Sequence, residues 1–226
     1  MKTWLTHHLP FSPDANSTGV YSGANALVNG VGMSDRANLN KGFLRGAQMT
    51  DDDGVAQFET IFPGHYAGRA THVHVMTHLN AKAEANNTIW HTTATHAGQI
   101  FFDQALITAV EKTAPYSGNR QGKTANSADT ILLVEAATSD PFFDYVQLGD
   151  DISAGVLAWY TIAINQTFSR PIMAVAAAYK EGGKMATTNP KIPGLAQIFP
   201  GGFPTAYQPA YGAPAPAPTG KSKGQG

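Results

Sequence analysis

The chain has 226 residues, a length typical of one domain with a tail. Charged residues make up 14% of the chain and the formal net charge is −1, so the composition provides no basic surface of the kind that binds nucleic acid or an anionic membrane. The absence of cysteine excludes disulfides, cysteine-based zinc sites and a thiol nucleophile, and the 23 glycines and 14 prolines favour many turns and short strands.

Targeting signals are weak. No uninterrupted apolar stretch of about 20 residues occurs, so the sequence predicts no membrane span. Residues 1–15 lack the apolar region of a signal peptide and are expected to form an irregular segment. Three N-x-S/T sequons, starting at Asn16, Asn86 and Asn165, are typical of a secreted glycoprotein, but a chain rich in Asn, Ser and Thr also produces such triplets by chance.

Turn signals separate short apolar runs between residues 16 and 199, which we expect to form one domain. Asp51-Asp52-Asp53-Gly54 predicts a hairpin turn rather than a calcium site, because the other ligands of a calcium loop are missing. A strand is expected over residues 55–61. Residues 70–79 alternate between polar and apolar with a period of two, which predicts a further strand.

Later strands are expected over residues 98–102, 130–136 and 156–164, and one short helix is expected near residues 139–143. Residues 200–226 are rich in proline and glycine and predict a disordered tail. Several short strands separated by turns are typical of an all-β sandwich or barrel.

Two histidines, His72 and His74, are separated by one residue within the alternating run. Side chains two residues apart on a strand lie on the same face, so both imidazoles project together, while Val73 and Val75 face the opposite way. Two imidazoles on a rigid strand can hold one metal ion. The alternative is a pair of polar residues on a solvated face.

Two tyrosines and an arginine accompany this pair in the sequence. Tyr66 precedes His72 by six residues and Arg69 precedes it by three, while Tyr21 lies in the glycine-flanked segment GVYSG. Phenolate oxygen is a hard ligand that suits Fe(III). Two tyrosines and two histidines therefore form a candidate four-ligand set for ferric iron.

These motifs resemble the core of the intradiol ring-cleavage dioxygenases, most closely the extracellular fungal branch of aromatic compound dioxygenases. The resemblance rests on Pro63-Gly64-His65-Tyr66, Gly68-Arg69 and His72-Val73-His74, with GVYSG upstream and the Gln99 strand downstream, and it covers residues 16–164. The family has further strands before the GVYSG element, among them one that contains Trp and His. The resemblance therefore implies a chain shortened at its N-terminus.

The resemblance also implies a fold, a cofactor and a set of site residues. The fold is a β-sandwich of the intradiol dioxygenase type, and Tyr21, Tyr66, His72 and His74 match the ligands of a mononuclear non-haem Fe(III). Arg69 matches an arginine beside the bound substrate, and Gln99 matches a glutamine near it. Tyr66 also acts in the reaction, because it leaves the metal and can take a proton from the substrate.

The activity implied by the resemblance is cleavage of a catechol-type aromatic by O2 to a muconate-type product, by an extracellular enzyme. The expected partners of the enzyme are the aromatic substrate and O2, and neither nucleic acid nor a membrane is expected. The oligomeric state stays open. An alternative of another class is a non-catalytic or truncated β-sandwich module that binds phenolics or cell-wall polymers. A third, an Fe(II) oxygenase with two histidines and a carboxylate, needs an acidic residue that the sequence lacks between His74 and Glu84.

Overall fold

The computed structural model describes residues 3–8, 44–85, 88–171, 176–179 and 182–185. Strands predominate in these ranges, beside two short α-helices and three 3-10 turns. The expectation of an all-β protein is therefore confirmed. Within the same ranges, no helix has both the length and the apolar character needed to cross a membrane. Tyr21 and the C-terminal tail, residues 200–226, lie outside the described residues.

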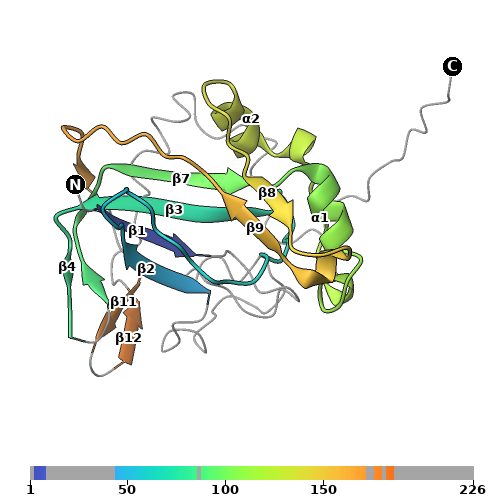
Figure 1. Ribbon diagram of the computed structural model, residues 1–226, viewed down its shortest axis with the longest axis horizontal. Coiled ribbons are helices and arrows are strands. Elements are labelled where there is room, and N and C mark those ends of the chain that lie inside the picture. Colours follow the sequence, from blue (N-terminus) through green and yellow to red (C-terminus); the bar gives the residue numbers. More distant parts are fainter. Residues whose placement is uncertain (1–2, 9–43, 86–87, 172–175, 180–181, 186–226) are drawn as a thin grey trace, which may run out of the picture.

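The elements follow one another along the chain as shown in Figure 1. The strands are β1 (Thr3–His8), β2 (Arg45–Met49), β3 (His72–Leu79), β4 (Lys82–Ala83), β5 (Ile89–Trp90), β6 (Thr93–Ala94), β7 (His96–Phe101), β8 (Asp144–Gln147), β9 (Val156–Trp159), β10 (Arg170–Pro171), β11 (Ala176–Tyr179) and β12 (Gly182–Met185). The helices are α1 (Gln104–Val110) and α2 (Thr130–Ala136), with 3-10 turns η3 (Tyr116–Gly118), η4 (Asn126–Ala128) and η5 (Ile152–Ala154).

The main sheet contains four antiparallel strands in the order β2-β1-β3-β7. β3 is an interior strand, with Thr6 of β1 opposite Met76 and Gln99 of β7 opposite His74. β1 lies within residues 1–15, where the sequence predicted an irregular segment. The structure differs at Thr3–His8, because this segment is held on both sides by pairing with β2 and β3.

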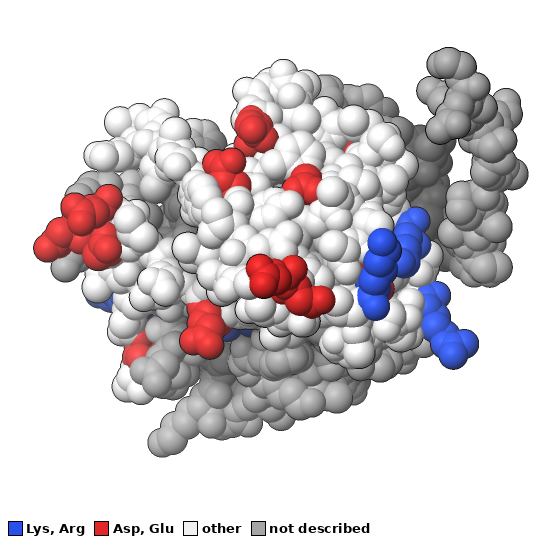
Figure 2. Space-filling view, turned by 45° about the vertical axis from the view of Figure 1, so that its right-hand side comes forward, with Lys and Arg blue, Asp and Glu red and all other residues white. Residues whose placement is uncertain are grey.

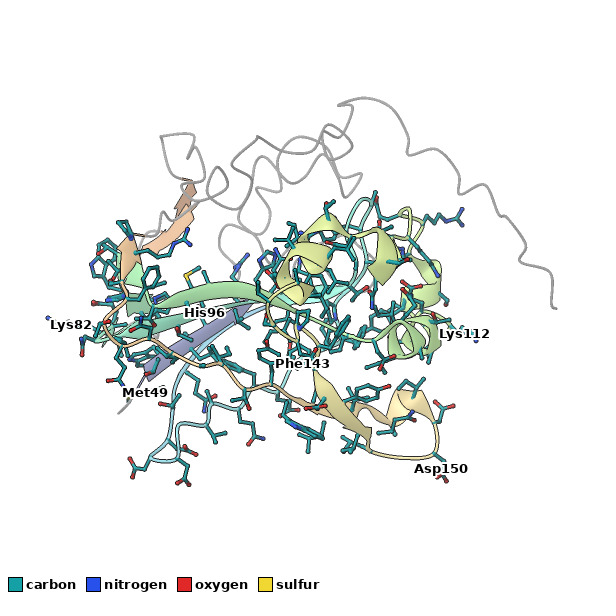
Figure 3. All side chains as sticks on the ribbon, turned by 90° about the horizontal axis from the view of Figure 1, so that it is seen from above. Met49, Lys82, His96, Lys112, Phe143 and Asp150 are labelled. Carbon is teal, nitrogen blue, oxygen red and sulfur yellow. The ribbon has the colours of Figure 1, made fainter. Side chains whose placement is uncertain are left out.

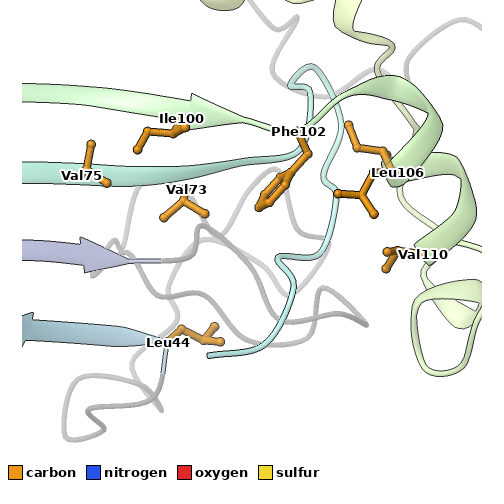
Figure 4. Packing of buried hydrophobic residues seen from close by; sticks show 8 residues of the cluster. Leu44, Val73, Val75, Ile100, Phe102, Leu106 and Val110 are labelled. Carbon is orange, nitrogen blue, oxygen red and sulfur yellow. The ribbon is translucent and has the colours of Figure 1, made fainter. Parts of the chain in front are cut away.

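The two faces of β3 and β7 have different neighbours. Val73 and Val75 of β3 and Ile100 of β7 are buried on one face, where Phe102, Leu106 and Val110 join them (Figure 4). His72 and His74 belong to the opposite face by strand alternation, as the sequence predicted. Burial of the valines against apolar side chains therefore fixes the direction in which the histidines project.

A two-stranded ribbon, β8–β9, covers the valine face of the sheet, and α2 lies over the histidine face (Figures 1 and 3). Tyr145 of β8 and Val156 of β9 pack against the core that contains Val73 and Ile100. On the other side, Leu132 of α2 packs with Phe101 and Ala70. The sheet is thus enclosed on both faces near the start of β3.

Some predicted elements differ in the structure. Residues 130–136 form α2 rather than a strand, because the Asp129 side chain accepts hydrogen bonds from the backbone N–H groups of Ile131 and Leu132 and so caps a helix. Residues 55–61 form no strand, and residues 139–143 form no helix. The strand predicted over residues 156–164 ends at Trp159.

The turn predicted at residues 51–54 is present, although no hairpin follows it. Asp51 Oδ1 accepts hydrogen bonds from the N–H groups of Asp53 at 3.0 Å and Val55 at 2.8 Å. Gly54 has a φ of 82°, a conformation that glycine adopts without strain. The Asp51 carboxylate therefore stabilises its own turn through these hydrogen bonds.

On the face shown in Figure 2, the charged side chains form separate small groups on a mostly uncharged surface.

Candidate active site

A tight turn places Tyr66 beside Arg69. The N–H of Arg69 donates to the carbonyl of Tyr66 at 3.4 Å, and Gly68 takes a φ of 87° at the third position of the turn. A type II turn needs a positive φ at that position, which explains the glycine. The turn brings the two side chains together, and Arg69 Nη1 lies 3.5 Å from the Tyr66 hydroxyl oxygen.

His72 and His74 converge on a common point. Their Nε2 atoms lie 3.1 Å apart and their ring centroids 4.8 Å apart. His72 is completely buried, and its Nδ1 lies 2.6 Å from the carbonyl oxygen of Ala70. Because a carbonyl only accepts hydrogen bonds, Nδ1 of His72 carries a proton, and in the neutral ring Nε2 then presents a lone pair. This is the tautomer that can bind a metal through Nε2.

Tyr66 completes the part of the predicted ligand set that the structure describes. Its ring packs edge-to-face on His72, with centroids 5.9 Å apart. The structure therefore brings Tyr66, His72 and His74 together. Tyr21, the fourth predicted ligand, lies outside the described residues.

The Arg69 guanidinium lies at the centre of a hydrogen-bond network. Its Nη2 donates to Gln99 Oε1, and its Nε donates to Asp129 Oδ2 at 2.9 Å. Gln99 is opposite His74 in the β3–β7 pairing, so its side chain shares the histidine face. Arg69 is 7% exposed and Asp129 is fully buried, so the ion pair lies away from bulk water.

Asp129 was missed by the sequence analysis. The signal that could have found it is an aspartate directly before an apolar run, the usual start of a helix. The sequence instead predicted a strand over that run, residues 130–136. The error in secondary structure therefore concealed the residue that accepts a hydrogen bond from Arg69.

A second set of contacts holds the loop that leads to Tyr66. His65 Nδ1 lies 2.9 Å from Glu111 Oε1, and its Nε2 lies 3.1 Å from the Gln121 carbonyl oxygen. Asn119 Nδ2 donates to the His65 carbonyl at 2.8 Å. The chain after α1 thus fixes the residue before Tyr66, which gives His65 a structural role. Lys123 Nζ also pairs with Glu111, at 2.6 Å from Oε2.

Burial alters the acidity of three groups around the site. Burial raises the pKa of Glu135 to about 7, with the Asp129 charge adding to the effect and the Arg69 charge and the Gln99 backbone opposing it. Burial alone would also raise the pKa of Glu111, but hydrogen bonds from His65 and Lys123 lower it overall. Burial raises the pKa of Tyr116 to about 12, and its hydroxyl donates to the Phe62 carbonyl.

The donor atoms are of the kind that suits a ferric ion, and they differ from the carboxylates that bind Mg²⁺ or Ca²⁺. No three side chains of the His, Cys, Asp and Glu types gather into a metal site within the described ranges. The grouped donors are instead two imidazole nitrogens and one phenol oxygen. Two imidazoles that bind one metal at about 2.1 Å and near a right angle have nitrogens about 3 Å apart, which agrees with the His72–His74 separation.

The remaining histidine contacts lie toward the other end of β3. His78 is buried, and its Nδ1 lies 3.1 Å from the Thr93 carbonyl oxygen. Its Nε2 lies 3.2 Å from Thr6 Oγ1, and its ring packs edge-to-face on His91. Burial lowers the pKa of His78. These contacts join β1, β3 and β6 and indicate a structural role.

Comparison with solved structures shows the fold to be that of intradiol dioxygenases. The chain is similar to an intradiol ring-cleavage dioxygenase from Tetranychus urticae, with a TM-score of 0.53 and 24% identity over 74% of each chain. It is also similar to a second solved dioxygenase, with a TM-score of 0.51 and 24% identity over 74% of this chain and 73% of the other. No protein-family model matches, and no curated protein sequence matches either.

Proposed function

We propose that this protein is a non-haem Fe(III) dioxygenase that opens the ring of a catechol-type aromatic between its two hydroxyl-bearing carbons. The observation that carries the proposal is the convergence of His72 Nε2 and His74 Nε2, 3.1 Å apart, beside Tyr66 and Arg69. The fold shared with solved dioxygenases supports the reaction class. The product is a muconate-type diacid that contains both atoms of O2.

In this proposal, Tyr66, His72 and His74 hold the iron together with Tyr21. A ferric ion at this position supplies Lewis acidity toward the oxygens of the bound catechol. The Ala70 carbonyl keeps the proton of His72 on Nδ1, so that Nε2 remains a metal ligand. The buried environment of His72 excludes water from this side of the site.

Arg69 and Tyr66 act on the substrate. The Arg69 guanidinium stabilises negative charge that develops on the aromatic oxygens, because it is held in place before the substrate arrives. Gln99 holds the Nη2 side of this guanidinium. The Tyr66 phenolate oxygen would also accept a proton from a substrate hydroxyl.

We also infer an extracellular location. The support is the resemblance to the fungal secreted branch and the exposed sequon at Asn165, where Thr167 Oγ1 donates to Asn165 Oδ1 at 2.8 Å. The sequons at Asn16 and Asn86 begin outside the described residues. When a secretion signal is fused to the chain in a eukaryotic host, we expect the protein in the culture medium, with a mass that falls after endoglycosidase treatment. Protein that is retained in the cells, or secreted without glycan, would contradict this inference.

The function is tested by loading the purified chain with ferric iron and recording its visible spectrum. We expect about one iron per chain and a tyrosinate-to-iron absorption band that shifts when catechol is added without O2. Admission of O2 should then give oxygen uptake and a ring-opened diacid, identified by mass spectrometry. Tyr66→Phe should weaken the band and abolish turnover.

The matched control is Tyr160→Phe, which removes a hydroxyl that donates to the Asp140 carbonyl at 2.7 Å, a contact that includes none of the proposed ligands. It should keep the band and the turnover. A folded wild-type chain that stays colourless and iron-free after loading would overturn the proposed function. The binding module for phenolics would then be the better explanation.

A further inference from the structure

We propose that Asp129 is a positioning residue, which orients both Arg69 and His72 through one buried carboxylate. The inference rests on the proposed function for its catalytic meaning, and on the contacts of Asp129 for its physical content. Asp129 has no exposed surface and follows Arg69 by 60 positions in the chain. It therefore joins a distant segment to the turn that carries Arg69.

The two oxygens of the Asp129 carboxylate accept hydrogen bonds from different parts of the chain. Oδ1 accepts from the N–H groups of Ile131 at 2.9 Å and Leu132 at 3.0 Å, which starts α2. Oδ2 accepts from Arg69 Nε at 2.9 Å and from the Ala70 N–H at 2.6 Å. Four N–H donors on one buried carboxylate compensate for the loss of water around its charge.

The Arg69 contact fixes the direction of the guanidinium. Asp129 holds Nε, while Nη2 donates to Gln99 and Nη1 lies beside the Tyr66 hydroxyl. A flexible arginine side chain would otherwise adopt many rotamers and lose part of its electrostatic effect. Asp129 therefore selects the orientation in which Arg69 faces the proposed substrate site.

The Ala70 contact extends to His72. Asp129 Oδ2 holds the N–H of Ala70, and the carbonyl of the same residue accepts the Nδ1 proton of His72 at 2.6 Å. Ala70 is fully buried and packs with Phe101 and Leu132, which limits any other position for its backbone. One carboxylate thereby supports the tautomer of His72 that leaves Nε2 open to a metal.

The test must separate the orientation of Arg69 and His72 by Asp129 from its role as a helix cap, and the chain contains a matched control. Asp103 caps α1 in the same way, with its side chain accepting from the Leu106 N–H at 2.8 Å. Asparagine is about as good a helix cap as aspartate, so Asp129→Asn and Asp103→Asn both keep the cap. In Asp129→Asn, an amide placed toward Arg69 Nε and the Ala70 N–H meets two donors and loses the charge.

Both variants are first studied as the full chain without metal. We expect 15N NMR of the wild type to show the proton of His72 on Nδ1 and slow hydrogen exchange of the Ala70 amide. In Asp129→Asn, the Ala70 amide should exchange at least about tenfold faster and His72 should show a mixture of tautomers, while Asp103→Asn resembles the wild type. After iron loading, Asp129→Asn should raise the KM for catechol about 10–100-fold.

The proposal is overturned if Asp129→Asn leaves the His72 tautomer, the Ala70 exchange and the KM as they are in Asp103→Asn. Should Asp129→Asn fail to fold, the wild type decides, because rapid exchange at Ala70 or a proton on His72 Nε2 contradicts the proposed chain of contacts. Should the wild type fail to bind iron, the proposed function is lost. The two NMR readouts in the metal-free chain still decide the role of Asp129.

Discussion

His72 and His74 bring their Nε2 atoms to within 3.1 Å of each other, from adjacent same-face positions of an interior strand. The residue between them, Val73, is buried on the opposite face in the apolar core. One strand thus carries the candidate site on one side and the packing that supports it on the other. The two sides are separable by mutation.

Replacing residues on the two faces should give different defects. His74→Ala is expected to reduce bound iron to a small fraction of the wild-type amount, because it removes a proposed ligand. Val73→Ala should lower the free energy of unfolding by about 1–3 kcal/mol and keep the iron stoichiometry. Metal analysis together with urea denaturation checks both, and an iron-loaded His74→Ala chain would contradict the ligand assignment.

The turn at Gly68 should be sensitive for a reason of backbone geometry alone. A Cβ at Gly68 would have no heavy atom within 4 Å, but the φ of 87° strains any other residue by about 1–2 kcal/mol. Gly68→Ala should therefore lower stability modestly and raise the KM for catechol, since the turn aligns Tyr66 with Arg69.

Gly54→Ala is the matched control for that prediction. Gly54 has a φ of 82° and equally open space, but its turn is the exposed one at Asp51. Its substitution should cost a similar amount of stability and leave the KM unchanged. Equal effects of both substitutions on the KM would show that the Tyr66–Arg69 turn is not special.

Glu135 should make the protein less stable as the pH rises. Burial, the first cause, raises its folded pKa to about 7 from an ordinary 4.5, so the folded state binds more protons than the unfolded state between these values. The free energy of unfolding therefore falls across this window, by about 1–2 kcal/mol because solvent partly screens this half-buried carboxyl. Glu135→Gln should remove that decline, as measured by denaturation from pH 4 to 8. The same decline of the free energy of unfolding with pH in Glu135→Gln would contradict this prediction.

Glu111 should have the opposite effect. Burial alone disfavours its charge, but the hydrogen bonds from His65 and Lys123 hold its folded pKa below the ordinary 4.5. Its stabilising contribution is present above the unfolded value and is lost as the pH falls through the folded value. Glu111→Gln should lower stability by about 1–2 kcal/mol at pH 7 and flatten the acid limb of the stability curve. Exposed Glu59→Gln is the control and should alter neither.

The strand that carries the histidines could be predicted because its alternation is regular and its apolar side meets a real core. The same reasoning failed at residues 130–136, where Asp129 accepts two backbone N–H groups and starts a helix. The apolar pattern of that short run fits a strand and a helix equally well. Only the helix cap at Asp129 distinguishes the two structures, and Arg69, which pairs with Asp129, is distant in the chain.

The candidate site was predictable to a similar extent. Tyr66, Arg69, His72 and His74 are close in sequence, so a turn and a strand are enough to bring them together. Gln99 followed from the resemblance to a family, and the β3–β7 pairing places it opposite His74. The contacts of His65 with Glu111, Asn119 and Gln121 depend on how the chain after α1 folds back. No local sequence pattern contains that information.

The ion pair between Arg69 and Asp129 also sets an order of events during synthesis. When the ribosome has produced Arg69, the Asp129 carboxylate is still 60 residues away, and Gln99 arrives 30 residues after the arginine. Until then Arg69 lacks the Asp129 carboxylate, and burying its charge without that partner is costly. A growing chain therefore contains Tyr66, His72 and His74 well before the carboxylate that orders Arg69 has been made.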